Sequence, residues 1–264
     1  MIRPSFGNGL SRIGLLGASI LLVAAIATIV PASLAADFSV SPMSLKFPLG
    51  TRSGEIQVRN LDQQPIRFQV RGVDWSQDES GKDSYVDSQS LIWFPRALEL
   101  GPGESRIIRV GVRAMPGSQE RAYILILQEV IVEGVKAEQQ RGAQVRLLLS
   151  VSVPIFVPPA KPEFGGSIES MALHGGTLNV AIGNTGNQHF SYREASIVGL
   201  GRDGTEKFTK SLPRSTLLAG SRQRFEVKIP QETCRQLREL ALTVLSPEQT
   251  ELKRRLDVSR ADCE

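Results

Sequence analysis

Few side chains in this 264-residue sequence are spaced for chemistry. Its only histidines, His174 and His189, lie beside turn-type glycine and asparagine residues, which favours a surface or turn role. The two cysteines, Cys234 and Cys263, form no CxxC motif, which argues against a redox or metal role. No HExxH, GxSxG or phosphate-binding glycine loop occurs, and no carboxylate pair stands out. We therefore expect no catalytic residue, no metal and no cofactor, and an enzyme is the weaker class.

The N-terminal segment has the pattern of a secretory signal peptide. Two arginines are its only charged residues, residues 13–30 are uncharged and rich in Leu, Ile and Ala, and small residues follow at positions 33 and 35. This apolar run is also just long enough to span a membrane, so an uncleaved anchor is the alternative. Pro31 and the small residues after it favour cleavage near Ala35 or Ala36. The sequence therefore predicts an exported protein whose mature form has no membrane span.

Charge and cysteine content agree with export. Loss of the signal segment would lower the formal net charge from +4 to about +2, and the remaining Lys and Arg residues are interspersed with Asp and Glu. No basic block remains, so a nucleic-acid partner is not indicated. In an oxidising compartment Cys234 and Cys263 are expected to form a disulfide that closes the C-terminal end of the chain.

The elements that must position any site are short strands. From Asp37 onward, apolar residues alternate with polar ones in brief runs that turn residues separate, as at Ile66, Phe68 and Val70. The run at 38–47 is broken by Pro42, which predicts an edge strand that kinks or switches. Only residues 231–239 could form a helical turn or two. This pattern is typical of antiparallel sandwiches of the immunoglobulin type.

A group of prolines at 158, 159 and 162 divides the chain. We therefore predict an all-β protein with two immunoglobulin-like β-sandwich domains in tandem after the signal peptide. The expected boundaries are 1–36 for the signal peptide, 37–159 for the N-terminal domain and 160–264 for the C-terminal domain.

The longest β-type run of the chain covers residues 143–157, AQVRLLLSVSVPIFV. Because side chains alternate along a strand, one face carries an unbroken apolar row. That row consists of Val145, Leu147, Leu149, Val151, Val153, Ile155 and Val157. An ordinary core strand explains this pattern. A sheet edge that lends its apolar row to another protein by strand addition explains it as well, and Pro154 favours an edge or a strand end.

Several segments, taken in order, resemble the periplasmic chaperones of chaperone–usher pili, in particular their divergent, archaic branch. The matching segments are LELGPGESRIIRV at 98–110, Ala122-Tyr123 followed by LILQEV, LSVSVPIFVPP at 149–159, NTGN at 184–187 and LLAG at 217–220. The resemblance covers nearly all of the chain after the signal segment, and it is strongest from residue 98 to residue 159.

The resemblance implies a periplasmic, non-enzymatic chaperone whose two domains have a boomerang arrangement. Such a protein binds and stabilises pilus or fimbrial subunits by donor-strand complementation, and it delivers them to an outer-membrane usher. The donor positions of the family fall on Val145, Leu147, Leu149 and Val151. The free protein could also pair with a second copy through this donor edge.

Relatives anchor the terminal carboxylate of the subunit with two basic residues. Lys46 falls at the first of these positions, where an ordinary solvated strand lysine is the alternative. Pro154 occupies the second position, where relatives usually have lysine, and this departure puts a two-point anchor in doubt. A secreted structural or adhesive sandwich protein, such as a pilus component, is the alternative function for the whole chain.

Overall fold

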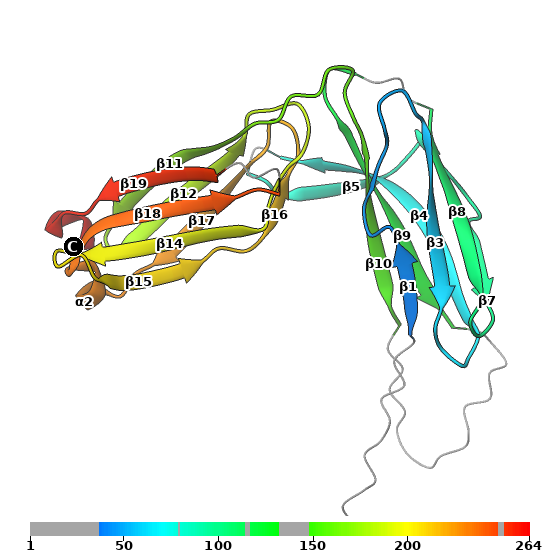
Figure 1. Ribbon diagram of the computed structural model, residues 1–264, viewed down its shortest axis with the longest axis horizontal. Helices are drawn as coiled ribbons and strands as arrows, with labels where there is room; N and C mark the ends of the chain where they lie inside the picture. Colours follow the sequence, from blue (N-terminus) through cyan, green and yellow to red (C-terminus); the bar gives the residue numbers. More distant parts are fainter. Residues whose placement is uncertain (1–36, 79, 114–116, 132–147, 248–250) are drawn as a thin grey trace, which may run out of the picture. The chain divides into compact units, whose positions relative to one another are not determined.

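The computed structural model consists almost entirely of β-strands, which confirms the all-β expectation (Figure 1). It describes residues 37–78, 80–113, 117–131, 148–247 and 251–264. The predicted signal peptide and its cleavage sites at Ala35 and Ala36 lie outside these residues. Within the described ranges, no helix combines the length and the hydropathy that crossing a membrane requires.

The first ten strands build a sandwich of two sheets. One sheet has the order β1 (Phe38–Ser41), β3 (Ser53–Asn60), β8 (Ser105–Val112) and β6 (Leu91–Phe94). The other has the order β2 (Leu45–Lys46), β10 (Ser150–Val157), β9 (Arg121–Val130), β4 (Ile66–Gln77) and β5 (Asp83–Asp87). A further strand, β7 (Ala97–Leu100), pairs with the first part of β4. We refer to these strands together as the N-terminal sandwich.

The predicted break at Pro42 is a change of sheet. β1 pairs antiparallel with β3 in one sheet, whereas β2 pairs parallel with β10 in the other. Proline lacks the N–H that a sheet ladder needs, so the strand ends before Pro42 and resumes after it. This switch brings β2 alongside the end of β10.

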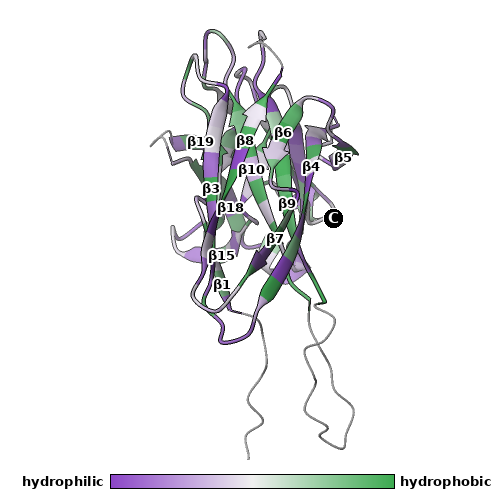
Figure 2. Ribbon diagram, turned by 90° about the vertical axis from the view of Figure 1, so that its right-hand side faces the viewer, coloured by the Kyte–Doolittle hydropathy of each residue, from purple (hydrophilic) through white to green (hydrophobic). Residues whose placement is uncertain are grey.

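The core of the N-terminal sandwich follows from the alternation in the sequence. Ile66, Phe68 and Val70 of β4 are buried as predicted, whereas Gln69 and Arg71 between and after them are exposed. Figure 2 shows hydrophobic (green) and hydrophilic (purple) residues succeeding one another along this strand. Each buried side chain of this size stabilises the fold by roughly 1.5–3 kcal/mol.

The remaining strands form the C-terminal sandwich. Three strands pair in the order β11 (Gly166–His174), β12 (Thr177–Asn184) and β17 (Arg222–Lys228), and β13 (Phe190–Tyr192) pairs with β16 (Ser215–Leu217). Four more strands pair in the order β15 (Glu206–Ser211), β14 (Glu194–Gly201), β18 (Leu237–Leu245) and β19 (Glu251–Asp257). Strands of both sandwiches belong to one compact unit of the chain.

The helical turn expected within residues 231–239 is present and is short. Helix α2 covers Gln231–Cys234, and β18 already begins at Leu237. A bulge shifts the register between β14 and β18, so that Leu237 and Leu240 both lie buried although they are three positions apart. This spacing resembles a helical period, although these residues belong to β18.

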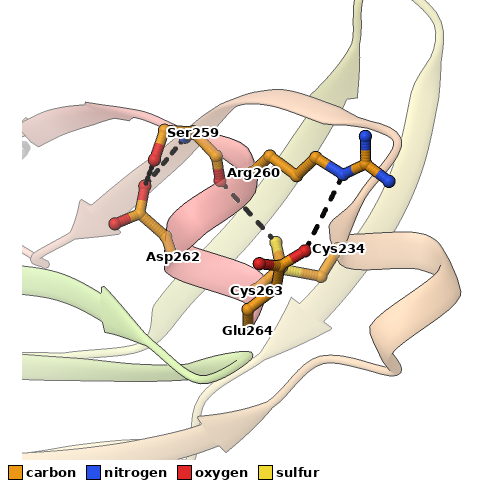
Figure 3. The surroundings of a disulfide bond; sticks show 6 residues. All are labelled: Cys234, Ser259, Arg260, Asp262, Cys263 and Glu264. Carbon is orange, nitrogen blue, oxygen red and sulfur yellow. Dashed lines mark hydrogen bonds and ion pairs between the residues drawn. A yellow bond between two sulfur atoms is a disulfide. The ribbon is translucent and has the colours of Figure 1, made fainter.

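The predicted disulfide between Cys234 and Cys263 is present, with the two Cα atoms 5.8 Å apart. It joins the end of α2 to the 3-10 helix η1 (Arg260–Cys263), the last element of the chain (Figure 3). Both cysteines are buried. The C-terminus is thereby fastened to the sandwich.

Candidate functional site: the free edge of β10

Strand β10 leaves most of one backbone edge unpaired. On one side it pairs with β9 along its whole length (Figure 1). On the other side β2 reaches only Ile155 and Phe156. From Ser150 to Pro154 this second side has no strand partner among the described residues. An unpaired edge of this kind can accept an extended chain from another protein.

The apolar row of β10 passes from the core to the margin of the sandwich. Val153, Ile155 and Val157 are buried in the core of their own sandwich. Val151 is half-buried and packs against that core, and Leu149 is half-buried beyond the start of the strand. The row is therefore neither fully enclosed nor fully free, and only its first described members can reach a partner.

The strand that the structure describes, β10, covers only the second half of the apolar run at residues 143–157. β10 begins at Ser150, and Leu149 is held by the end of β9 without being part of a strand. The backbone N–H of Glu129 donates to Leu149 O at 2.9 Å, and Leu149 N donates to the Glu129 carboxylate at 3.1 Å. β9 continues to Val130, so in the same register Glu129 and Val130 lie opposite Leu149 and Leu148, although β10 itself begins at Ser150. The predicted donor residues Val145 and Leu147 lie outside the described residues.

Lys46 lies beside the C-terminal end of β10. Lys46 is an exposed residue on β2 opposite Phe156, and its Nζ donates to Gln188 Oε1 at 3.2 Å. The same Nζ lies 5.1 Å from the centre of the Phe164 ring. Gln188 is only 1% exposed, and its Nε2 has no hydrogen-bond partner among the described residues. An exposed ammonium beside an amide is suited to binding a carboxylate.

His189, for which the sequence favoured a surface or turn role, directly follows the bend at residues 186–188 and is partly buried. Its side chain is 16% exposed, and that of Glu120, with which it pairs, is 2% exposed. Glu120 Oε2 lies 2.7 Å from both the backbone N and the Nδ1 of His189. The imidazole stacks on the Phe156 ring at 3.8 Å between centroids. These partners are far apart in the sequence, so no local pattern could have revealed the cluster.

Among the described residues, no group of three or more His, Cys, Asp or Glu side chains is placed to hold a metal ion. What the edge of β10 offers is backbone hydrogen bonding, apolar side chains and one exposed ammonium. These are the elements of protein recognition by strand pairing.

Comparison with known proteins gives one family match. Residues 37–163 match the family described as pili and flagellar-assembly chaperone, PapD N-terminal domain. No curated protein matches the sequence at a significant level.

Solved structures of similar fold come from several bacteria. A chain in the CsuC–CsuE chaperone–tip adhesion subunit pre-assembly complex of archaic Csu pili of Acinetobacter baumannii is 17% identical, with a TM-score of 0.56 over 82% of this chain and 98% of that chain. The CupB2 chaperone of Pseudomonas aeruginosa is 12% identical, with a TM-score of 0.51 over 84% and 100%. A chain in the Salmonella enterica complex of SafA pilin with the SafB chaperone is 11% identical, with a TM-score of 0.52 over 86% and 99%. At these identities the similarity shows the fold, and it confirms two immunoglobulin-like sandwiches.

Proposed function

Because this chain belongs to the pilus-assembly chaperone family, whose N-terminal domain it carries at residues 37–163, we propose that it captures pilus or fimbrial subunits by lending them the edge of β10. The observation that carries this proposal is the unpaired side of β10 from Ser150 to Pro154, next to the half-buried Leu149 and Val151. The proposed donor residues are Val145, Leu147, Leu149 and Val151. The protein is proposed to act without catalysis and without a cofactor.

The physical basis is the cost of an exposed apolar groove. A sandwich that lacks one strand has unpaired backbone groups and an open core, and both promote aggregation. A lent strand supplies hydrogen bonds to the backbone and apolar side chains to the groove. The register must hold, because a slip of one residue would present Leu148, Ser150 and Ser152 in place of the apolar row.

Lys46 is the proposed anchor for the terminal carboxylate of the subunit. Its ammonium is exposed and already engages a polar partner, Gln188. Pro154 offers no second cation. If the Gln188 amide rotates, its Nε2, which has no partner among the described residues, turns toward the site and supplies a second donor.

The partner class rests on the family and on its structural neighbours. Two of the similar structures are complexes, one of a chaperone with a tip adhesion subunit and one of a chaperone with a pilin. For this chain we propose subunits of that kind, a periplasmic location after cleavage near Ala35 or Ala36, and delivery to an outer-membrane usher. Pairing of two free copies through the β10 edge is a further part of the proposal.

Capture of a subunit tests the donor edge. The chain is co-expressed with candidate small secreted β-proteins, and the complex is isolated by affinity purification. Leu149→Asp is expected to lower the yield of complex at least about tenfold, because a charge enters an apolar groove. Its matched control is Leu148→Asp, since Leu148 is 47% exposed and lies outside the row. If the unaltered chain captures and protects no subunit, the proposed function is wrong. Unfolding of the Leu149→Asp variant would instead identify Leu149 as core.

The anchor is tested separately from the edge. Lys46→Ala is expected to weaken binding of a subunit with a free C-terminal carboxylate by about tenfold, whereas Lys46→Arg keeps the charge and most of the affinity. The control is the same subunit with an amidated C-terminus, whose binding should be equal for both chains. Equal loss on the two subunits would show that Lys46 does not bind the carboxylate.

A further inference from the structure

A hollow lined by arginines lies at the disulfide-bonded end of the C-terminal sandwich. It has a volume of about 380 Å³, and its lining consists of Arg202, Arg235, Leu237, Ser259 and Arg260. Every charged residue of this lining is therefore an arginine. The buried Leu237 contributes the apolar part of the surface.

The three arginines come from different segments, each fixed by its own contacts. Arg202 lies in the β14–β15 turn, where Gly201 N donates to Thr205 O at 2.8 Å. Arg235 follows Cys234 at the end of α2, and Arg260 begins η1, which ends at Cys263. The disulfide thus joins the segments of two of them (Figure 3). The backbone that carries the guanidinium groups is therefore ordered before any ligand binds.

Little of this positive charge is neutralised within the protein. The guanidinium groups of Arg202 and Arg235 have no ion pair or hydrogen bond among the described residues. Arg260 Nε lies 3.8 Å from Glu264 Oε1, and both side chains are exposed, so this pair is weak.

The nearby acids are engaged elsewhere. The Thr205 hydroxyl and Lys207 lower the pKa of Asp203 to about 2, so this carboxylate remains charged within its own turn. The Ser259 hydroxyl and backbone N–H both donate to Asp262 and lower the pKa of that carboxyl. Neither acid belongs to the lining of the hollow.

We propose that this hollow, the arginine hollow, binds a phosphate monoester. Guanidinium groups bind phosphate and carboxylate oxygens through pairs of parallel hydrogen bonds. A carboxylate has only two oxygens to offer, whereas the terminal group of a phosphate monoester offers three and carries up to two negative charges. Three arginines from three segments therefore match the phosphate better. The ligand is either a soluble monoester or the headgroup of a lipid.

The test uses the chain from residue 37 to residue 264 with its disulfide intact. Isothermal titration with glycerol 3-phosphate and with inorganic phosphate measures soluble ligands, and sedimentation with phosphatidic acid or phosphatidylcholine vesicles measures headgroup binding. The double variant Arg202→Ala/Arg235→Ala is expected to weaken binding at least about tenfold. Arg235→Lys keeps the charge but loses the paired hydrogen bonds of the guanidinium group, and it should weaken binding about threefold to fivefold. The matched control is Arg67→Ala/Arg71→Ala, which removes the same charge from β4 and should change binding less than about twofold.

Each outcome decides the matter. Saturable binding of glycerol 3-phosphate that the hollow variants lose supports a soluble ligand. Binding to phosphatidic acid vesicles alone, again lost in these variants, supports a lipid headgroup. Absence of binding to every probe overturns the proposal, and so does equal loss in the control variant, which would indicate attraction to net charge only. Subunit capture by the same variants is expected to stay unchanged, so this proposal and the donor-edge proposal can fail independently.

Discussion

The two sandwiches differ in the charge of an edge strand. β19 ends its sheet and carries the charged side chains Lys253, Arg254 and Arg255. Arg254 also donates to the carbonyl oxygens of Ile168 and Glu169 on β11. β10 has no charged residue from Ser150 to Val157, and part of its backbone edge is unpaired. Charged side chains on an edge oppose pairing with other chains, and their absence permits it. The contrast supports the proposal that the edge of β10, unlike that of β19, pairs with a partner.

The largest expected effect is on stability, and it distinguishes the core part of β10 from its donor part. Val153 is fully buried in the core of its sandwich, so Val153→Asp should lower the free energy of unfolding by at least about 4 kcal/mol. Urea unfolding followed by tryptophan fluorescence measures this change. Ser152→Asp, on the exposed face of the same strand, is the control and should cost less than about 0.5 kcal/mol. A Val153→Asp variant with the same free energy of unfolding as the Ser152→Asp control would contradict the division of the row into a core part and a donor part.

Much of this arrangement could be predicted from the sequence, because it depends on local alternation and on proline. The inward positions of β4, the change of sheet at Pro42 and the apolar row of β10 all follow from side-chain period and from the missing proline N–H. The disulfide followed from composition and export. These features need no knowledge of distant contacts.

The remaining features depend on partners far away in the chain. β10 begins at Ser150, opposite Gln128 of β9, and the apolar pattern of residues 143–157 does not encode this boundary. His189 is held by Glu120 and Phe156, and Leu237 joins β18 through a bulge opposite Gly201. Each of these outcomes is a tertiary effect that overrides the local pattern.

A moderate effect on stability is expected at the C-terminal end of β10, where Phe156 stacks on His189. His189→Ala removes the partner of the buried Glu120 carboxylate and the ring that stacks on Phe156. The free energy of unfolding should fall by roughly 2–4 kcal/mol, because the buried carboxylate keeps only the backbone N–H of residue 189 as a partner. Adding Glu120→Gln to this variant removes that charge and should restore part of the loss. Strictly additive losses in this double-mutant cycle would show that the two side chains do not act as a pair.

The smallest effect on stability is expected on β19, where the contrast with β10 can be reversed. Lys253→Ile and Arg255→Ile remove two edge charges whose ion pairs, with Glu251 and Glu239, involve exposed arginine and lysine side chains. Such pairs contribute little to stability, so the free energy of unfolding should change by less than about 1 kcal/mol. Self-association should nevertheless rise, because an uncharged edge can pair with a second copy. Analytical ultracentrifugation over a concentration series measures it. The control, Arg67→Ile with Arg71→Ile, places the same residues on β4, which has neighbours on both sides. If both double variants associate equally, added hydrophobicity and not the open edge is the cause, and the protective role assigned to the β19 charges is wrong.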